Sequence, residues 1–295
     1  MTENKLQVIA QDNLKQVKSL LSNINVKKRF EEILGQKAPG FMASIINAIN
    51  ANPELRKCEP NSVVSSAIVA ATLDLPIDQN LGFAYIIPYK VQGIYKAQFQ
   101  IGYRGFIQLA IRSGVYKTIN AAEVYEGEIK SVNRFTGEIE FELNAQKTNK
   151  IVGYVAYFKL LNGFEKYYYM TIDEIKKHAQ KYSKTYNSKN GSWQNEFHAM
   201  ALKTVIKMLL KKYGVLSVDM QTAIMADQAV INQKNGKFEY EYVDNMSYEK
   251  DEIFNNKDIE LNNEEIIEEE EIEDIESIES NENELKELKE EVKDK

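Results

Sequence analysis

Residues 97–114, AQFQIGYRGFIQLAIRSG, constrain the fold most strongly because their hydrophobic period changes in the middle. From Tyr95 to Ile101 apolar and polar residues alternate, which is the period of a half-buried strand. After Gly102 the apolar residues recur at helical spacing, and Gly114 stands where a helix commonly ends. We therefore expect a strand that leads directly into a helix.

The expected strand has two different faces. Phe99 and Ile101 point to one side, while Lys96, Gln98 and Gln100 point to the other. The polar face has two interpretations: the solvated side of a structural corner, or a surface that contacts a ligand.

Charge is distributed unevenly along the chain. Residues 244–295 hold 22 acidic and 6 basic residues, a net charge of −16, whereas residues 1–243 hold 31 basic and 22 acidic residues, a net charge of +9. A basic body with an acidic tail is typical of nucleic-acid-binding proteins. The alternative is a solvated globular domain with an unrelated tail.

Several classes of protein lack support in the sequence. One cysteine, Cys58, gives no disulfide framework, and two histidines, His178 and His198, are too few for an ordinary His/Cys zinc site. No apolar run approaches the roughly 20 residues that span a bilayer, and no signal-peptide core is present, so we expect a cytoplasmic protein without a membrane segment. The P-loop, G-x-S-x-G and H-E-x-x-H motifs are missing, which favours binding over catalysis.

Helical and strand-like patterns both occur along the chain. Helices are expected over most of residues 1–40, over 41–50, from Pro60, and over 193–213, where Trp193 heads an apolar stripe and is expected in the core. Thr171 and Glu174 form a capping box that begins another helix. Strands are expected in a hairpin and two meanders, over residues 81–90, 95–103, 116–128, 139–143, 152–161 and 167–170.

Lys203, Lys207 and Lys211 recur every four residues along the last of these helices. Like charges at this spacing repel by a few tenths of a kcal/mol, so the row predicts an anion opposite it. A nucleic-acid phosphate is one candidate, and a solvated lysine face is the alternative. If phosphate is the anion, replacing Lys203 and Lys207 with alanine weakens single-strand binding and leaves the fold intact.

Carboxylates form a second regular pattern. Glu138, Glu140 and Glu142 line one face of a strand, and Glu123, Glu126 and Glu128 precede them. A metal-dependent nuclease would need such groups to converge with further ligands, and no His, Asp or Asn pattern accompanies them. A solvated outer face is the favoured interpretation.

The acidic tail, which includes EEIIEEEEIEDIESIE, is too polar to fold alone and is predicted to be disordered. Leu285, Leu288 and Val292 stand at helical spacing and would form an amphipathic helix on a partner. The tail either competes with DNA for the basic body or docks a partner.

Three segments resemble the RecT family of phage and prophage single-strand annealing proteins. They are NPELRKCEPNSVVSSAIVAATLDLPID, then LGFAYIIPYK with AQFQIGYRGFIQLAIRSGVYKTINAAEVYEGE, and WQNEFHAMALKTVIKMLLKKYG, in the family's order over residues 41–214. The chain departs from the family in DLPID, where a glycine is usual, and in its acidic tail.

The resemblance implies an α+β core with a twisted antiparallel sheet packed by helices, similar to the core of other annealing proteins. It implies a protein that coats single-stranded DNA, pairs it with a complementary strand without ATP or another cofactor, and holds the duplex. It also implies a homo-oligomer, either a ring or a helical filament, that works beside a 5′–3′ exonuclease and the host single-strand-binding protein in a bacterial cytoplasm. Mg²⁺ is a candidate modulator. A passive single-strand binder is the alternative.

These arguments divide the chain into a helical N-terminal segment for packing or oligomerisation (1–40), a DNA-binding core (41–243) and a partner-binding or autoinhibitory tail (244–295). We expect no catalytic or metal-binding residues. The predicted DNA contacts are Lys96, Gln98, Gln100, Arg104, Arg112, Tyr116, Lys117, Lys184, Tyr186, Lys189, Lys203, Lys207 and Lys211.

Overall fold

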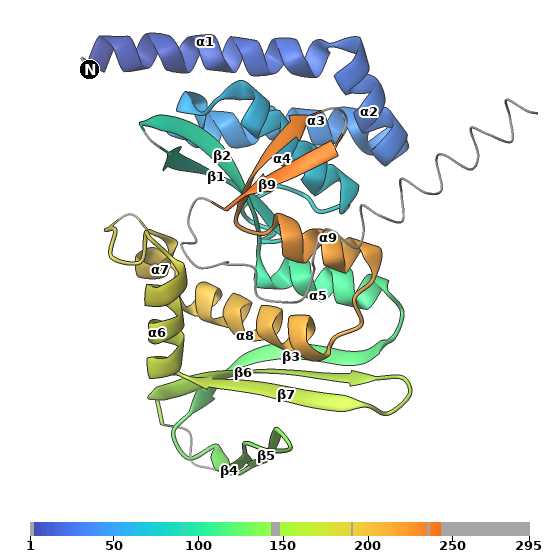
Figure 1. Cartoon of the computed structure of the whole chain (residues 1–295), viewed down its shortest axis with the longest axis vertical. Helices are drawn as coiled ribbons and strands as arrows, with labels where there is room; N and C mark the ends of the chain where they lie inside the picture. The colour runs from blue at the N-terminus through green and yellow to red at the C-terminus, as the bar shows by residue number, and fades with distance from the viewer. Residues whose placement is uncertain (1–2, 92, 143–147, 190, 235–236, 243–295) are drawn as a thin grey trace, which may run out of the picture. The chain divides into compact units, whose positions relative to one another are not determined.

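The computed structural model describes residues 3–91, 93–142, 148–189, 191–234 and 237–242, which form antiparallel sheets packed by helices (Figure 1). The predicted α+β class is therefore confirmed, while the predicted tail lies outside the described residues. The helices are α1 (Glu3–Ser22), α2 (Ile24–Leu34), α3 (Ala38–Ala51), α4 (Pro60–Thr72), α5 (Tyr103–Arg112), α6 (Ile172–Tyr182), α7 (Ser192–Asn195), α8 (Phe197–Tyr213) and α9 (Val218–Ala226), with 3₁₀ turns η1 (Gly35–Lys37) and η2 (Leu55–Lys57).

The N-terminal segment is helical, as predicted. Asn23 separates α1 from α2, and its side-chain oxygen accepts a hydrogen bond from the Asn25 amide, which caps the second helix. α1 packs along α4, and α2 packs on α3 and α4. α3 begins at Ala38, before the expected residue 41, because Pro39 suits the first turn of a helix. A role for this segment in oligomerisation stays a prediction.

A four-stranded sheet, in the order β1-β2-β8-β9, packs on α4. Its strands are β1 (Ala84–Val91), β2 (Ile94–Ile101), β8 (Ala229–Lys234) and β9 (Lys237–Glu241), and every pair is antiparallel. The predicted hairpin is confirmed, with Ala84 opposite Ile101. α4 is buried on nearly all sides because β2 and β8 cover one side while α1 and α2 cover others.

The corner between β2 and α5 depends on two glycines. A Cβ atom at Gly102 would overlap with the Gly82 carbonyl oxygen, and one at Gly105 would overlap with the Phe83 carbonyl oxygen. The Gly102 amide also donates a hydrogen bond to the Phe83 carbonyl at 3.0 Å. Because Gly102 and Gly105 have no side chains, the chain before β1 can lie directly against the start of α5.

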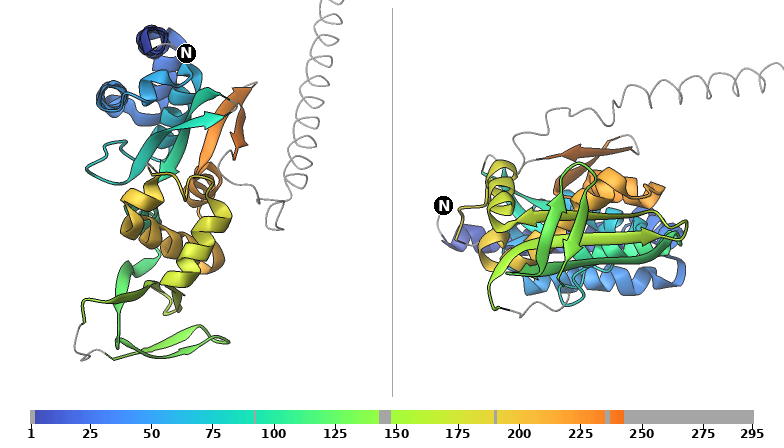
Figure 2. Two further views of the ribbon diagram at one scale, coloured as in Figure 1. Left: turned by 90° about the vertical axis from the view of Figure 1, so that its left-hand side faces the viewer. Right: turned by 90° about the horizontal axis from the view of Figure 1, so that it is seen from below.

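A second layer is built by the three-stranded sheet β3-β6-β7, with strands β3 (Tyr116–Tyr125), β6 (Ile151–Leu160) and β7 (Glu165–Thr171). α8 packs on this sheet and buries Tyr154, Ala156 and Phe158 of β6. In both views of Figure 2 the helices lie on one side of the sheet. The strands β4 (Ile129–Asn133) and β5 (Glu138–Phe141) form a separate hairpin.

The expected helix over residues 193–213 is interrupted. Glu196 has φ −133° and ψ 46°, so α7 ends before it and α8 begins after it. The apolar spacing continues across the break, because Trp193 contacts Phe197 with ring centroids 5.9 Å apart. Periodicity alone therefore gave no sign of the interruption. The capping box at Thr171 and Glu174, in contrast, is present as predicted.

Asp74 has φ +47°, in the left-handed region that glycine favours. It lies in DLPID, where the family resemblance led us to expect a glycine. Aspartate tolerates this conformation better than most residues, so the chain can make the same turn without glycine.

Replacing Gly105 with alanine should destabilise the protein by about 1–3 kcal/mol, because the new methyl group must displace backbone atoms. Helix propensity alone would predict a gain of up to about 1 kcal/mol for the same change. The matched control is Gly40→Ala in α3, where a Cβ meets nothing within 4 Å. Urea unfolding measures both variants, and equal stability of the two would contradict the close approach.

Candidate nucleic-acid interface

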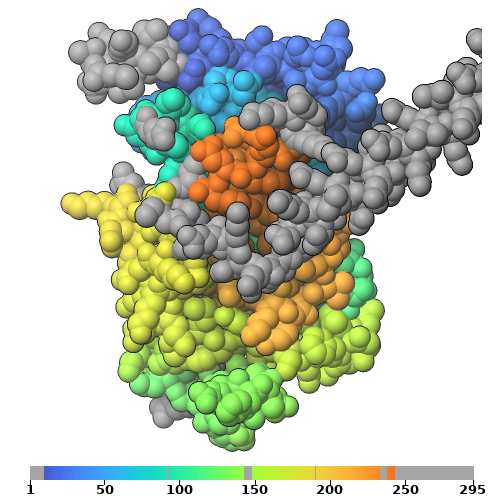
Figure 3. Space-filling model, in the orientation of Figure 1, coloured from blue at the N-terminus to red at the C-terminus, as the bar shows by residue number. Residues whose placement is uncertain are grey.

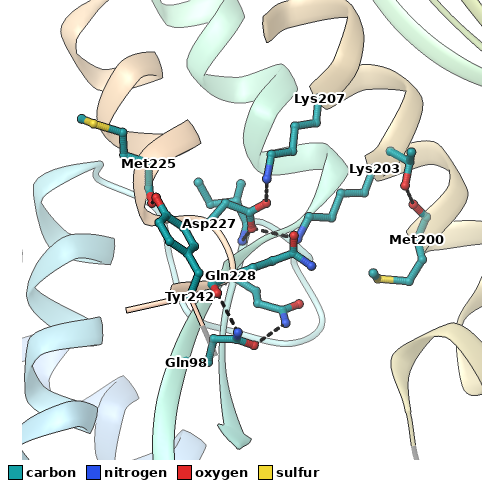
Figure 4. A network of polar contacts seen from close by, with 11 residues as sticks. Gln98, Met200, Lys203, Lys207, Met225, Asp227, Gln228 and Tyr242 are labelled. Atoms are coloured by element: carbon teal, nitrogen blue, oxygen red, sulfur yellow. Dashed lines mark hydrogen bonds and ion pairs between the residues drawn. The ribbon is translucent and has the colours of Figure 1, made fainter. Parts of the chain in front are cut away.

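The carboxylate of Asp227 joins three elements in the interior (Figure 4). The residue follows α9 and is 1% exposed. Its Oδ1 accepts hydrogen bonds from Lys203 Nζ at 2.8 Å and from the Ile101 amide at 2.9 Å. Its Oδ2 accepts from Lys207 Nζ at 2.6 Å. The carboxylate therefore holds α8 to the end of β2 and to the chain that enters β8.

The anion predicted opposite the lysine row is this carboxylate. The side chains of Lys203 and Lys207 are only 7% and 11% exposed, and both bind Asp227. The buried Asp227 therefore offsets the repulsion between these lysines, and their spacing is no longer an argument for a bound phosphate. The prediction that alanine at both positions leaves the fold intact is disfavoured, because Asp227 would remain buried without its cations.

The pKa of Asp227 reflects two opposing effects. Burial raises the pKa, because a buried carboxylate loses its hydration, while Lys203 and Lys207 lower it. The net direction is a pKa below the ordinary value. Asp227 therefore stays ionised, and its contribution to stability is lost only when the pH falls through this lowered pKa.

The polar face of β2 is covered rather than open. Gln98 is fully buried, and its Nε2 donates to the Gln228 carbonyl at 2.7 Å while its Oε1 accepts from Gln100 Nε2 at 2.8 Å. Lys96 forms an ion pair with Glu241 of β9 at 2.9 Å. Both interpretations of this face, solvated or in contact with a ligand, left out cover by other strands. The sequence analysis predicted no strands in the region of β8 and β9.

Arg112 and Tyr116 bind neighbouring backbone. Arg112 donates to the Leu73 carbonyl at 2.7 Å and lies 3.8 Å from Asp74 Oδ2. The Tyr116 hydroxyl accepts from the Val215 amide at 2.9 Å, and its ring meets Phe158 edge-on. Both predicted contacts therefore have internal partners that fix their side chains.

An exposed cationic surface lies elsewhere, on α6 and the loop that follows it. We call residues 176–189 the basic segment; it contains no acidic residue, and its exposed lysines are Lys176, Lys177, Lys181, Lys184 and Lys189. In Figure 3 α6 and this loop, in yellow, form part of the molecular surface. Lys184 and Lys189 belong to the predicted set. Sequence reasoning missed the other three, although five lysines within 14 residues that include no acidic residue were the available signal.

Aromatic side chains support the basic segment from within. The rings of His178 and Tyr182 are tilted against each other with centroids 4.6 Å apart, and the ring centroids of Tyr186 and Trp193 are 6.4 Å apart. Gln194 Nε2 donates to the Tyr186 carbonyl at 2.6 Å, which ties the loop to α7. Trp193 is buried, so its predicted core position is confirmed. Tyr186 is half-buried beside it.

Arg104 and Lys117 are exposed, and Lys211 is partly exposed. Arg104 Nε donates to the Tyr103 hydroxyl at 3.3 Å. Burial raises the pKa of Tyr85, and the charges of Arg104 and Glu196 act on it in opposite directions. Arg104, Lys117, Lys184 and Lys189 are exposed and stay predicted DNA contacts.

The carboxylate pattern has the geometry of a solvated face. Glu138 and Glu140 are exposed, and Glu142 pairs with Lys130 at 3.0 Å. Within the described residues, no three His, Cys, Asp or Glu side chains form a group suited to a metal ion. In that same part of the chain no helix is long and apolar enough to cross a membrane.

Comparison with known proteins gives a consistent result. The model of the RecT family matches residues 39–241. An uncharacterized protein of Bacillus subtilis, YqaK, is 47% identical over 239 residues, which cover 80% of this chain and 81% of that protein. Protein RecT of Escherichia coli is 32% identical over 181 residues, which cover 60% of this chain and 66% of that protein.

Replacing Asp227 with alanine should cost about 3–5 kcal/mol of unfolding free energy, because two ammonium groups lose their buried counter-charge. The control is Lys37→Ala, which removes the exposed Lys37–Asp74 ion pair and should cost less than about 1 kcal/mol. Denaturant unfolding at pH 7 compares the two. A cost near that of the surface control would show that the network does not join the elements.

His178 should make stability fall as the pH drops below neutrality. Burial, followed by the charges of Lys207 and Lys181, lowers its pKa from 6.5 to about 4, so the unfolded chain binds the proton first. The stabilisation is complete above pH 6.5 and declines toward pH 4. Between pH 7 and pH 5 the unfolding free energy of the unsubstituted protein should fall by about 1–2 kcal/mol more than that of the His178→Gln variant. Parallel pH profiles of unfolding free energy would contradict this assignment.

Proposed function

This chain belongs to the RecT family, and on that premise we propose that it anneals complementary DNA strands without ATP on a surface formed by its basic segment. Family membership supports single-strand annealing in recombination as the general function, with single-stranded DNA as the ligand. The proposal adds where the DNA lies and how pairing proceeds. The observation that carries it is the group of exposed lysines on residues 176–189, which lies inside the matched region.

The first step is neutralisation of one strand. Lysine side chains that contact phosphates release condensed counterions, and this release drives binding without regard to sequence. Contacts to the backbone leave the base edges free, which pairing requires. From the predicted set we keep Arg104, Lys117, Lys184 and Lys189 as contacts, and we add Lys176, Lys177 and Lys181. Lys203 and Lys207 act instead through the buried network that positions α8.

The second step is pairing. A complementary strand is repelled by the first strand, and the cationic surface reduces that repulsion. Base stacking then supplies about 1.4 kcal/mol per step, so no nucleotide hydrolysis is needed. The duplex carries twice the phosphate charge of one strand, so the same surface holds the product at least as well as the substrate.

We further propose that many copies act together. A single basic segment covers only a short stretch of DNA, so coating a long strand requires a homo-oligomer, either a ring or a helical filament. The family resemblance also suggests a 5′–3′ exonuclease that produces the strand and a host single-strand-binding protein that covers it first. Both are proposals for this chain.

The annealing proposal predicts that the full chain pairs two dye-labelled complementary oligonucleotides faster than they pair alone, without ATP. Raised salt should abolish the acceleration, because counterion release drives the binding. Energy transfer between the dyes measures the rate. Slower pairing than in the protein-free control would instead identify a passive single-strand binder.

Lys184→Ala with Lys189→Ala tests the location. If both lysines contact phosphate, the slope of log affinity against log salt should fall by about 1.4, at about 0.7 per contact. The control is Lys27→Ala with Lys28→Ala on α2, where both lysines are exposed and pair with Glu31 and Glu32. Equal salt slopes for the two double variants would show that the basic segment does not contact DNA.

A further inference from the structure

We propose that two copies of this chain pair through an exposed apolar patch at one end of the three-stranded sheet. The apolar patch consists of Ile111, Leu161, Phe164, Val215 and Val218. The proposal rests on the proposed function in one respect, that copies of the chain act together. It goes further by naming the surface on which two copies meet, and it places that surface outside the N-terminal segment for which a role in oligomerisation was predicted.

Apolar exposure is concentrated on this patch. Its five residues are each between 40% and 78% exposed, and they are half of the ten large apolar residues that are exposed in the described part of the chain. Exposed apolar residues that stand singly are ordinary on a protein surface. A contiguous group of them marks a surface that another molecule covers.

Two hydrogen bonds bring the loops of the patch together at the start of β3. The Leu161 amide, in the turn between β6 and β7, donates to the Val115 carbonyl at 3.0 Å. The Val215 amide, in the loop between α8 and α9, donates to the Tyr116 hydroxyl at 2.9 Å. Because Val115 and Tyr116 are consecutive, both loops are attached to the same point of the chain.

The remaining residues extend the patch on either side. The centroid of the Phe164 ring lies 6.0 Å from that of Phe158, which meets the Tyr116 ring edge-on. Ile111 is in the last turn of α5, and Val218 is the first residue of α9. In Figure 1 the end of α5, the start of α9 and the turn between β6 and β7 lie on the same side of the body. The five side chains therefore form one surface.

The backbone under the patch is fixed before any partner binds. Gly163 has φ +91°, which makes the turn between β6 and β7 tight, and its amide donates to the Leu160 carbonyl at 3.1 Å. Ser217 caps α9 by accepting a hydrogen bond from the Met220 amide. An interface built on fixed backbone loses little conformational entropy on association.

The charges around the patch favour a protein partner, and in particular a second copy. Lys212, Asp219 and Glu165 are exposed at its edge, so both signs of charge are present. A DNA strand would need a continuous series of cations instead. In a two-fold contact the same surface is present on both sides, so the carboxylates of one copy can meet the lysine of the other.

The size of the patch suits a reversible pair. An aromatic side chain buries roughly 150–250 Å² when it is fully covered, so five large side chains that are about half exposed offer roughly 500 Å² per copy. Two copies together reach about 1,000 Å², the lower limit for a specific interface. We therefore expect association that depends on protein concentration.

Pairing at the apolar patch leaves the basic segment open. β7 begins at Glu165, next to the patch, and ends at Thr171, where α6 begins. Its seven residues span about 23 Å, so the two surfaces lie at opposite ends of β7. A paired molecule therefore presents two DNA-binding surfaces and can hold two strands at once.

The first test is sedimentation velocity without DNA, over a wide range of protein concentration. The full chain should associate more as its concentration rises. Leu161→Glu with Val215→Glu should raise the dissociation constant of pairing more than about tenfold, because carboxylates then face each other across the contact. Raised salt should leave the pairing of the full chain intact, since apolar burial is not screened.

The matched control is Ile24→Glu with Ile94→Glu, which places the same charges on exposed apolar residues outside the patch. It should associate as the full chain does, and urea unfolding checks that both double variants keep the fold. Equal association of the two double variants would overturn the proposal. So would a full chain that stays monomeric at every concentration, which would assign the patch to a different partner.

Cysteine cross-linking tests the two-fold contact without adding charge. The one cysteine of the chain, Cys58, is buried, and burial raises the pKa of its thiol to about 12, so it does not react. In a mixture of the Leu161→Cys and Val218→Cys variants, a short bismaleimide should join two copies through their patches. The Ile24→Cys variant should stay uncross-linked. Equal cross-linking of this control, or none in the mixture, would contradict self-pairing.

Failure of this proposal differs from failure of the proposed function. If Leu161→Glu with Val215→Glu associates as the full chain does while the full chain accelerates strand annealing, annealing stands and self-pairing fails. If the full chain pairs through the patch but does not accelerate strand annealing, self-pairing stands and annealing fails.

Discussion

The buried carboxylate of Asp227 is the interaction on which the arrangement of the body depends. It binds two lysines of α8 and the backbone amide at the end of β2, and it stands between α9 and β8. Its removal would leave two ammonium groups without their carboxylate in a place that water does not reach. The four-stranded sheet and the layer of α8 are therefore held together by charge as well as by apolar packing. The exposed lysines of α6 share the support of this layer, because α6 packs on β6 and β7, the strands that α8 also covers.

Local patterns in the sequence predicted the parts of the fold that local interactions determine. The alternation in residues 95–101 predicted β2, and the capping box at Thr171 predicted the start of α6, as the structure shows. The strands β8 and β9 were missed, and so was Asp227. Their role depends on pairing with β2, which lies about 130 residues away, and no local period reports such a partner. A single acidic residue within the apolar run AIMADQAVI was the one available signal.

In the candidate interface, too, local patterns predicted some features and missed those that depend on distant parts of the chain. Residues 176–189 hold five exposed lysines without an intervening acidic residue. The regular spacing of Lys203 and Lys207 predicted a phosphate contact, but both lysines bind the buried Asp227. Spacing predicts which side chains share a helix face. It does not predict whether that face meets solvent, a ligand or another part of the chain. The burial of Gln98 is a similar case, because a polar strand face is equally compatible with water and with a neighbouring strand that satisfies its amides.

The pairing of β2 with β8 also has a consequence for how the chain folds. During synthesis the hairpin of β1 and β2 emerges long before β8, so one edge of β2 has no partner while more than 120 residues are added. An unpaired strand edge is a template for pairing with other chains. The late arrival of residues 227–231 therefore sets the moment at which this edge closes, and contacts of such high sequence separation make folding slow. Until β8 is synthesised, the hairpin of β1 and β2 is an open sheet.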